Sequence, residues 1–258
     1  AGIIIFEPWA RANMPLADPV FMLSNYAIGV AMLGVMIALA SLYLVGQIEN
    51  YRRRAEDLLL NILPGSIAAR LKESSETIAD GYSEVTVLFP VIVDFTSMSS
   101  GADPVEVVNL LNDIFSKLDG LAEKHGLEKI KTIGDAYMVA AGLPKPRDDH
   151  TEAIVGFAMD MMTAVEQYKG FHGEPIQLRV GINTGPVVAG VIGRLKFIYD
   201  LWGDAVNVAS RMESSGLANQ IQVTVVVKEK LDSRYTFAER GPINIKGKGM
   251  MVTYLLES

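Results

Sequence analysis

The 258-residue sequence contains no cysteine, which excludes disulfide bonds, thiolate metal sites and cysteine nucleophiles. Basic residues are not in excess either, since the formal net charge is −7. Binding to nucleic acid normally requires a basic face, so we expect no nucleic-acid partner. Half of the residues are hydrophobic, which is a high share for a wholly soluble protein. The length predicts one large domain with accessory elements, or two small domains.

Charged residues are also absent from a long stretch near the N-terminus, residues 19–48. A helix needs about 20 apolar residues to cross a bilayer core, so we predict a transmembrane helix here; a buried helix of a large soluble core is the alternative. Arg52, Arg53 and Arg54 follow directly, and arginines beside a membrane helix mark its cytoplasmic side. Residues 1–18 are then a non-cytoplasmic loop fragment. We expect the protein in the cell membrane, with its folded domain in the cytoplasm.

Residues 49–72 are predicted to form a cytosolic helical segment. Apolar side chains recur there at spacings of three and four, the pattern of a coiled coil, at Ile48, Tyr51, Ala55, Leu58 and Ile62. The pattern stops before Pro64 after about two heptads. It indicates either a parallel helical dimer that continues out of the membrane or an amphipathic helix packed on its own domain. The polar stretch at residues 73–82 is predicted to be a linker.

A folded domain is predicted over residues 83–258. The apolar run at residues 85–93 is typical of a buried strand, and Asp103, Pro104 and Glu106 have the pattern of a helix start. We expect helices at residues 104–126, 149–168 and 204–214, with a short one near 228–231. Strands are expected at 129–137 (a hairpin), 177–184, 197–201, 221–226 and 243–255. This order predicts an α+β, ferredoxin-like fold with an antiparallel-type sheet and helices on one face.

The hairpin at residues 129–137 carries the first candidate site. Its sequence, Lys-Ile-Lys-Thr-Ile-Gly-Asp-Ala-Tyr, predicts two short strands joined by a tight turn at Gly134 and Asp135. Strict alternation places Lys129 and Lys131 on the same face. A strand lysine near a turn carboxylate suits a phosphate-bearing ligand with a metal ion, which makes Lys131 and Asp135 candidates. An exposed hairpin with a solvated lysine face is the other interpretation.

The second candidate site lies at the predicted helix 204–214. Asn207 and Arg211 are four residues apart and share one helix face, while the packed side carries Ala205, Val208, Ala209 and Met212. Amide and guanidinium donors bind anionic ligands, and Asp200 stands before the helix at a strand end, where ligand-reading groups are common. A polar outer helix face is the alternative for Asn207 and Arg211. We predict Asp204 to be the N-cap.

A third candidate lies near the C-terminus, where Lys246 and Lys248 alternate with Gly247 and Gly249. Glycines let a backbone approach a phosphate group closely, so this stretch is a candidate phosphate contact. A lysine-rich hairpin turn is the alternative interpretation.

Together these stretches resemble the class III nucleotidyl cyclases. The resemblance covers roughly residues 83–257 and is carried by five blocks, at residues 89–96, 129–137, 180–193, 197–213 and 244–249. The run Trp-Gly-Asp-Ala-Val-Asn-Val-Ala-Ser-Arg-Met-Glu, residues 202–213, is highly specific. The likeness is greatest to membrane-bound mycobacterial-type adenylate cyclases, which implies further membrane helices upstream.

The resemblance implies a role for each matched position. Lys131 and Asp200 occupy the base-selecting positions, where lysine donates to adenine N1 and aspartate accepts from the N6 amine. Guanine has the opposite pattern, so this pair favours ATP over GTP. Asn207 is expected to orient the ribose and Arg211 to bind the α-phosphate in the transition state. Lys246 is expected to contact the β- and γ-phosphates.

The family also implies two divalent ions, Mg²⁺ or Mn²⁺, held by hard oxygen ligands. Asp135 is one of the two metal carboxylates, and the backbone carbonyl of Ile92 is a further ligand. In this family the metal ligands and the base-selecting groups of one site come from opposite subunits. A homodimer is therefore expected, with ATP bound at the interface.

One block departs from the family pattern Phe-Ala-Asp-Ile-Val-Gly-Phe-Thr. Here Val91 replaces the first metal aspartate, and Pro90 and Asp94 stand where alanine and glycine are usual. Valine cannot coordinate a cation, so Asp135 is left without its usual partner. Asp94 lies three residues along and is expected to point elsewhere. Pro90 removes a backbone donor from a strand that should be central.

These observations predict a membrane-tethered adenylate cyclase that converts ATP to 3′,5′-cyclic AMP and pyrophosphate, with activity weakened by Val91. The alternative is a catalytically silent module that binds nucleotide or dimerises to regulate a partner. Guanylate cyclase activity is disfavoured by Lys131 and Asp200. A diguanylate cyclase would need a Gly-Gly-Asp/Glu-Glu-Phe hairpin, which the sequence lacks.

Overall fold

The computed structural model describes residues 19–73, 77–193 and 197–257. The chain forms two compact units, Ala1–Leu59 and Leu60–Ser258. The loop predicted at residues 1–18 lies outside the described residues.

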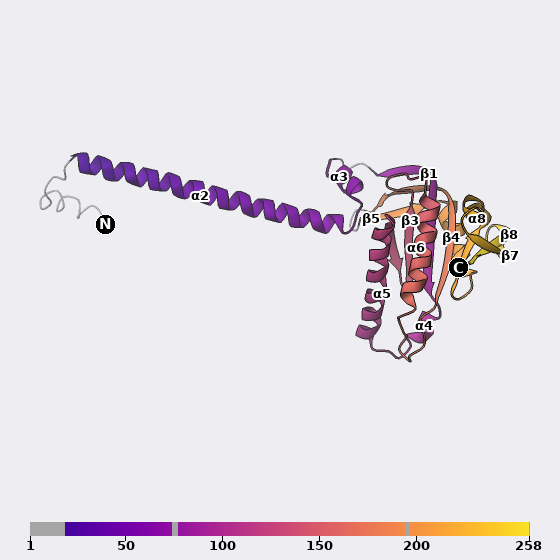
Figure 1. Ribbon diagram of the computed structural model, residues 1–258. Coiled ribbons are helices and arrows are strands. Elements are labelled where there is room, and N and C mark those ends of the chain that lie inside the picture. The colour runs from indigo at the N-terminus through magenta and orange to yellow at the C-terminus, as the bar shows by residue number, and fades with distance from the viewer. Residues whose placement is uncertain (1–18, 74–76, 194–196, 258) are drawn as a thin grey trace. The chain divides into compact units, whose positions relative to one another are not determined.

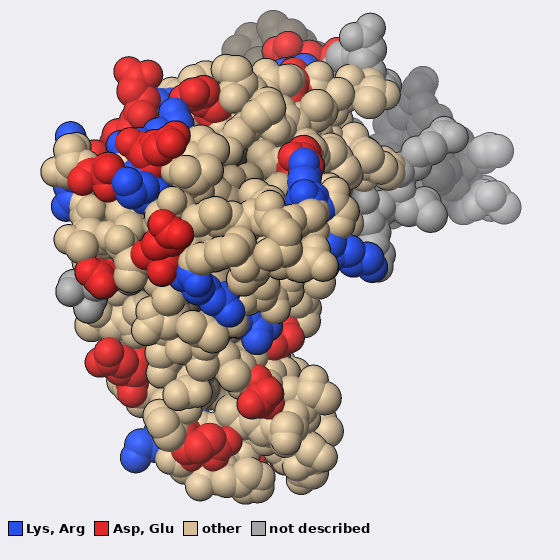
Figure 2. Space-filling view, turned by 90° about the vertical axis from the view of Figure 1, so that its right-hand side faces the viewer, with Lys and Arg blue, Asp and Glu red and all other residues tan. Residues whose placement is uncertain are grey.

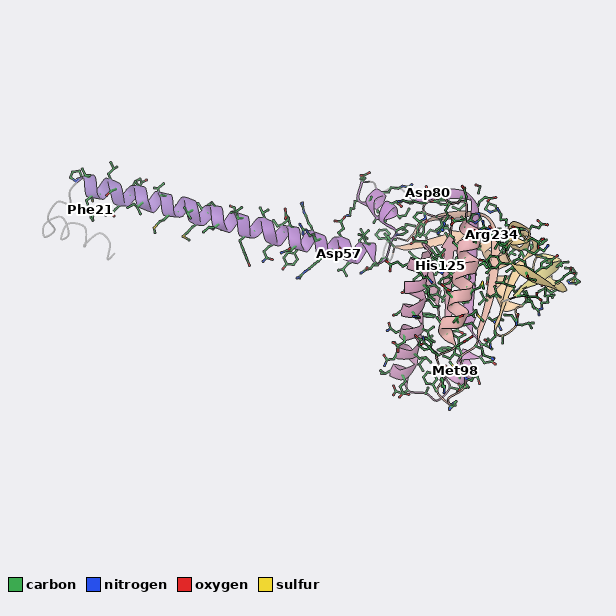
Figure 3. The ribbon with its side chains drawn as sticks, in the orientation of Figure 1. Phe21, Asp57, Asp80, Met98, His125 and Arg234 are labelled. Atoms are coloured by element: carbon green, nitrogen blue, oxygen red, sulfur yellow. The ribbon has the colours of Figure 1, made fainter. Side chains whose placement is uncertain are left out.

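The described residues of the first unit all belong to α2 (Pro19–Leu60), an uninterrupted helix that includes the predicted span and ends on the first residue of the second unit. Its side chains stand out along its whole length, between Phe21 near one end and Asp57 near the other (Figure 3). By length and composition α2 is a candidate membrane span. The helix ends at Leu60, so Ile62 does not belong to the predicted helical seam. Pro64 disfavours helical conformation at the preceding residue, and that residue, Leu63, is buried instead.

The second unit is a sheet covered by helices (Figure 1). Its helices are α3 (Gly65–Glu73), α4 (Phe95–Met98), α5 (Pro104–Lys124), α6 (His150–Val165), α7 (Asp204–Ser214) and α8 (Val225–Leu231). Its strands are β1 (Ala79–Ile92), β2 (Glu128–Ile133), β3 (Ala136–Ala141), β4 (Leu178–Ile192), β5 (Ile198–Trp202), β6 (Gln220–Thr224), β7 (Thr236–Ile245) and β8 (Gly249–Glu257).

The strand order is β2-β3-β1-β4-β6-β8-β7, with β5 paired to β4 off this path. Only β4 and β6 pair in parallel among the described strands; the other neighbours are antiparallel. The mainly antiparallel α+β architecture expected from the sequence is therefore confirmed. Asp103 caps α5 as predicted, because its carboxylate accepts from the backbone N–H of Val105 at 2.8 Å.

Alternation along β4 explains where the helices lie. Val180 and Ile182 point into the main core with α5, α6 and α8. Gly181 and Asn183 point to the other face, where Asn183 Nδ2 donates to the carbonyl of Ala205 in α7 at 3.0 Å. Helices α5 and α6 thus cover one face as expected, whereas α7 packs on the opposite face. Glycine at position 181 makes this second layer possible.

Two strands are longer than the sequence indicated. The predicted linker at residues 73–82 is wrong at its end, because Ala79–Tyr82 already pairs with β4 in the register Ala79↔Gly190 to Tyr82↔Val187. Strand β4 likewise continues from the predicted end at Thr184 to Ile192, where it also pairs with β5. Asp80 and Gly81 hid the first extension from a prediction based on apolar runs, and Gly185 and Pro186, which usually mark turns, hid the second.

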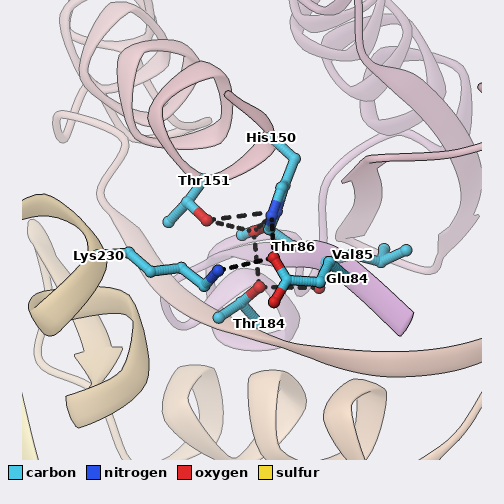
Figure 4. Close-up of polar contacts among 7 residues, drawn as sticks. All are labelled: Glu84, Val85, Thr86, His150, Thr151, Thr184 and Lys230. Carbon is cyan, nitrogen blue, oxygen red and sulfur yellow. Dashed lines mark hydrogen bonds and ion pairs between the residues drawn. The ribbon is translucent and has the colours of Figure 1, made fainter. Parts of the chain in front are cut away.

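A buried chain of hydroxyl groups joins β1 to β4 and α6 (Figure 4). The hydroxyl of Thr184 donates to the carbonyl of Val85 at 3.1 Å, so Thr184 must accept the hydrogen bond from Thr86, also at 3.1 Å. Thr86 has then used its only proton. The 2.7 Å contact between Thr86 Oγ1 and His150 Nδ1 therefore requires the imidazole to donate.

The other ring nitrogen of His150 lies 3.2 Å from Glu84 Oε2, which also accepts from Lys230 of α8 at 2.7 Å. Lys230 first, and then His150, hold the pKa of Glu84 below its usual range. The network thus links β1, α6 and α8.

We predict that Thr86→Val lowers the free energy of unfolding by about 1–3 kcal/mol, because a buried donor and acceptor lose their partner. Urea unfolding of the purified chain measures this change. Thr253→Val is the matched control: Thr253 is fully buried, and its hydroxyl has no hydrogen-bond partner within the described residues. That variant should be as stable as the original chain or more so. Equal losses in the two variants would contradict the bond assignment.

Candidate active site

The site is built on close contact between α7 and β4. A Cβ atom at Gly181 would overlap the backbone nitrogen of Glu213 and lie 2.6 Å from the carbonyl oxygen of Ala209. The helix therefore rests directly on the strand backbone. Asn183 bonds both the helix and β6, since its Oδ1 accepts from Thr224 at 2.8 Å. This packing fixes the rotation of α7 about its axis.

With α7 fixed in this way, its polar face is presented to solvent as predicted. Asn207 and Arg211 are exposed, whereas the packed side is buried at Ala205, Val208, Ala209 and Met212. Asn207, Arg211 and Lys246 line one hollow of about 370 Å³. The turn between β7 and β8 carries Lys246 and rests on α7 through Ile245, which packs on Val208 and Met212.

Asp204 does not cap α7 as the sequence suggested. Gly203 is the N-cap residue, with φ 146°, and Asp204 is the first residue of the helix. Its carboxylate binds Lys248 Nζ at 2.5 Å, on the rim of the same hollow. The carboxylate of Asp204 thus pairs with Lys248 of the β7–β8 turn instead of capping the first backbone N–H groups of α7.

The hairpin turn is confirmed: Ile133 pairs with Ala136 across Gly134, which has φ 61°. The predicted sharing of one face by Lys129 and Lys131 is wrong. A β-bulge between them breaks the alternation. Lys129 Nζ bonds Asp119 of α5 at 2.8 Å, whereas Lys131 forms a partly buried ion pair with Asp200 of β5.

This ion pair brings together the two residues expected to select the base. Asp200 is also held by its own strand, because Oδ1 accepts from the backbone N–H of Leu201 at 2.8 Å. The side chains of Lys131 and Asp200 are 33% and 17% exposed, so both remain accessible from solvent. The pair presents one cationic donor and one anionic acceptor side by side.

A separate hollow of about 620 Å³ contains the residues of the expected metal site. It is lined by Val91, Ile92, Asp94 and Asp135, together with Arg179. The guanidinium of Arg179 binds Glu213 Oε1 at 2.7 Å. Burial raises the pKa of Glu213, and Arg179 opposes that rise.

The donor set of this hollow does not fit a pair of divalent cations. Asp135 and Asp94 are its carboxylates, Val91 offers no oxygen from its side chain, and Arg179 contributes a positive charge. No cluster of three or more His, Cys, Asp or Glu side chains suited to a metal exists among the described residues. Two closely spaced divalent ions require more negative ligands than these.

The residues that depart from the family pattern leave the strand largely intact. Pro90 pairs with Val180 of β4, while the ladder to β3 is interrupted between Leu88 and Val91. Asp94 adopts φ 53°, a left-handed conformation that favours glycine and that aspartate tolerates better than most residues. Contrary to expectation, Asp94 lines the same hollow as Asp135.

The predicted site residues thus fall into three groups within the chain. Lys131 and Asp200 form one group, the hollow at α7 holds Asn207, Arg211 and Lys246, and the other hollow holds Val91, Ile92 and Asp135.

Sequence reasoning missed Arg179 and Glu128, two charged residues near these groups, and did not separate Lys248 from Lys246. Arg179 and Lys248 form ion pairs at the two hollows. Glu128 begins β2 two positions after the turn that follows α5, and its carboxyl has no hydrogen bond or ion pair in the part of the chain described. A charge at the second position of a largely apolar strand was the available signal for Arg179, whereas Glu128 begins a strand with two lysines, where a further charge does not stand out. Nothing in the local pattern distinguished Lys248 from Lys246.

The sequence matches the family described as the adenylate and guanylate cyclase catalytic domain over residues 78–258. The chain therefore belongs to this family, the class III cyclases, and its fold is that of their catalytic domain. This finding confirms the family and fold class expected from the sequence.

Among its relatives, the chain is 50% identical over 252 residues to an adenylate cyclase of Mycobacterium tuberculosis, covering 96% of this chain and 56% of that protein. It therefore spans little more than half of that relative's length. The guanylate cyclase domain of RhGC from Catenaria anguillulae, solved with GTP, has a TM-score of 0.67 and 36% identity over 69% of this chain and 98% of that one. The catalytic core of a rhodopsin-guanylyl cyclase with converted specificity, solved with ATPαS, has a TM-score of 0.68 and 38% identity over 71% and 100%.

The partly buried carboxyl of Glu128 gives a testable pH dependence. Burial raises the pKa of Glu128 to about 7 from an ordinary 4.5. Between these values the unfolded chain ionises while the folded chain keeps its proton, so stability falls as pH rises through this window. We predict that Glu128→Gln removes this loss and melts at a higher temperature than the original chain at pH 8. The two should melt at similar temperatures near pH 4.5, and thermal unfolding at both pH values checks this. A difference that is the same at both would contradict the assignment.

Proposed function

We propose that this chain is a membrane-tethered adenylate cyclase that forms 3′,5′-cyclic AMP and pyrophosphate from ATP in a homodimer, with turnover weakened at Val91. The observation that carries the proposal is the pairing of Lys131 with Asp200, which sets a donor beside an acceptor. Family membership and the 50% identical adenylate cyclase support the same reaction. The candidate span α2 supports the membrane tether.

Base selection follows from the hydrogen-bonding pattern of adenine. The Lys131 ammonium donates to adenine N1, and the Asp200 carboxylate accepts from the N6 amine. Guanine offers an N–H and a carbonyl at these positions, so both contacts would become mismatched. Mismatched, desolvated polar groups disfavour binding strongly. Relatives such as the guanylate cyclase domain solved with GTP suggest guanylate cyclase activity as an alternative. The mismatch between guanine and the Lys131–Asp200 pair disfavours that activity.

The phosphate chemistry belongs to the hollow at α7. In the reaction the ribose 3′-oxygen bonds to the α-phosphorus, and the bond from that phosphorus to the pyrophosphate oxygen breaks. Asn207 orients the ribose for this attack, and Arg211 stabilises the charge that builds on the α-phosphate. Lys246 holds the β- and γ-phosphates and so stabilises the leaving pyrophosphate. These roles use groups that share one hollow.

Activation of the 3′-hydroxyl is the step that the residues of this chain support least. The family relies on divalent ions, Mg²⁺ or Mn²⁺, for this step, and the hollow around Asp135 and Val91 does not fit a pair of them. Turnover by the chain as it stands is therefore expected to be low, although nucleotide binding at the other two groups is retained.

We predict that Val91→Asp raises cyclic AMP formation from ATP and Mn²⁺ by about 100-fold or more, since loss of groups that only support a metal site already costs 10–100-fold. Initial rates measured for both chains, with ATP and then GTP, check the change and the base preference. Val91→Leu is the matched control and should give no increase. An inactive Val91→Asp chain that still forms dimers would contradict the enzyme proposal, and faster turnover of GTP would contradict the base assignment.

The alternative function is a silent module that binds nucleotide or dimerises to regulate a partner. The observation that favours it is the Arg179 guanidinium beside Val91 in the incomplete hollow. A mixing experiment distinguishes the two functions, because each site in the proposed homodimer takes its two halves from opposite subunits.

We predict that the original chain complements the double variant Val91→Asp, Arg211→Ala. The first lacks a metal ligand and the second lacks the phosphate donor, so each alone should be nearly inactive. An equal mixture contains mixed dimers with one complete site, and should reach about one quarter of the activity of Val91→Asp alone, as random pairing of subunits requires. Adding Arg211→Ala to the original chain as well is the control. A mixture no more active than its parts would favour the silent module.

A further inference from the structure

Lys246 and Lys248 flank one glycine, yet their surroundings differ. Lys248 Nζ binds Asp204 Oδ2 at 2.5 Å. Lys246 lines the same hollow, and no carboxylate partner for it occurs among the described residues. The two lysines therefore do not offer the same charge to a ligand: one is neutralised by a neighbour, and the other is free.

The turn that carries both lysines has an apolar anchor at its base and a polar link at its tip. Its base is fixed because Ile245 is 2% exposed and packs on α7. Beyond Ile245, Gly247 and Gly249 adopt φ 81° and 76°, and Lys248 N–H donates to the carbonyl of Ile245 at 2.9 Å. At the tip, the bond from Lys248 to Asp204 is the side-chain link to α7 that the described residues show.

Asp204 places a negative charge where a triphosphate would have to lie. It is the first residue of α7, one position after Gly203, and lines the hollow with Asn207 and Arg211. An unpaired carboxylate here would repel phosphate, whereas a carboxylate paired with an ammonium repels it far less. The ion pair thus has two effects: it holds the turn against α7 and it removes the repulsion.

We propose that Lys248 is a positioning residue, which pairs with Asp204 so that Lys246 alone binds the β- and γ-phosphates of the nucleotide. This inference rests on the proposed function, because it assigns the second lysine of that same site. The alternative is an arrangement in which Lys246 and Lys248 both bind phosphate. In that case Asp204 would compete with the ligand for Lys248.

The test is equilibrium binding of ATP to the full chain and its variants. Lys246→Met should weaken binding by about 10-fold or more, the usual effect of losing a hydrogen bond between charged groups. Lys248→Met should weaken it by about 3–10-fold, because Asp204 is left unpaired beside the phosphates. Adding Asp204→Asn to Lys248→Met should recover most of that loss, since the repelling charge is gone. The same Asp204→Asn change should give no recovery in Lys246→Met.

In the Val91→Asp background the Lys248→Met variant should raise KM for ATP more than it lowers kcat, as expected for a residue that positions another. Cleavage by trypsin after Lys246, measured without nucleotide, should be faster in Asp204→Asn than in the original chain, because the turn loses its link to α7.

Two results would overturn the inference. One is a Lys248→Met defect equal to that of Lys246→Met and not relieved by Asp204→Asn, which would make Lys248 a phosphate ligand. The other is unchanged ATP binding in Lys248→Met together with unchanged cleavage in Asp204→Asn. Failure of the proposed function looks different: the original chain and Val91→Asp would both fail to bind ATP, while the effect of Asp204→Asn on cleavage would remain.

Discussion

The contact of α7 with the backbone of β4 at Gly181 is the constraint on which the candidate site depends. Any side chain at this position would overlap the backbone of Glu213, so the helix could not approach. The contact sets the height and rotation of α7, and therefore the direction in which Asn207 and Arg211 point. It also provides the surface on which Ile245 packs, and with it the turn that carries Lys246. One glycine thus determines the position of three polar side chains from two elements.

Charge pairing determines which polar groups remain free for a ligand. Lys248 is paired with Asp204 and Arg179 with Glu213, which leaves Lys246 and Arg211 as the cations at the hollows that have no ion-pair partner within the described part of the chain. Elsewhere on the surface, acidic and basic side chains are interleaved on the face that includes β7, β8 and α8 (Figure 2). Exposed pairs contribute little to stability, so their effect is mainly to shape the local potential. A ligand with several negative charges is therefore directed to the few unpaired cations.

The sequence predicted those features that depend on local periodicity. The four-residue spacing of Asn207 and Arg211 is enough to place them on one helix face, and Gly134 with Asp135 is enough to predict the hairpin turn. It did not predict features set by contacts between distant segments. The bulge that separates Lys129 from Lys131 depends on pairing with β3, the second layer formed by α7 depends on the face of β4 that carries Gly181, and the pairing of Lys248 depends on Asp204 in another element. The roles of Lys131, Asp200 and Lys246 came from the family resemblance and stay predictions.

The altered residues at the metal side interrupt the ladder between β1 and β3 but leave the pairing of β1 with β4 intact. Leu88 and Ile92, on either side of Pro90 and Val91, are buried in the main core, and β1 keeps its register with β4 through both positions. The substitutions therefore remove ligands without removing the strand that would carry them, and the hollow at α7 does not include any of the altered positions. The residues proposed to read the base and hold the phosphates stand on β2, β5, α7 and the β7–β8 turn, so on the proposed function nucleotide recognition and turnover depend on different parts of the fold. On that proposal the chain keeps nucleotide recognition while losing most of its turnover, and this is why restoring a single carboxylate at Val91 is the decisive change.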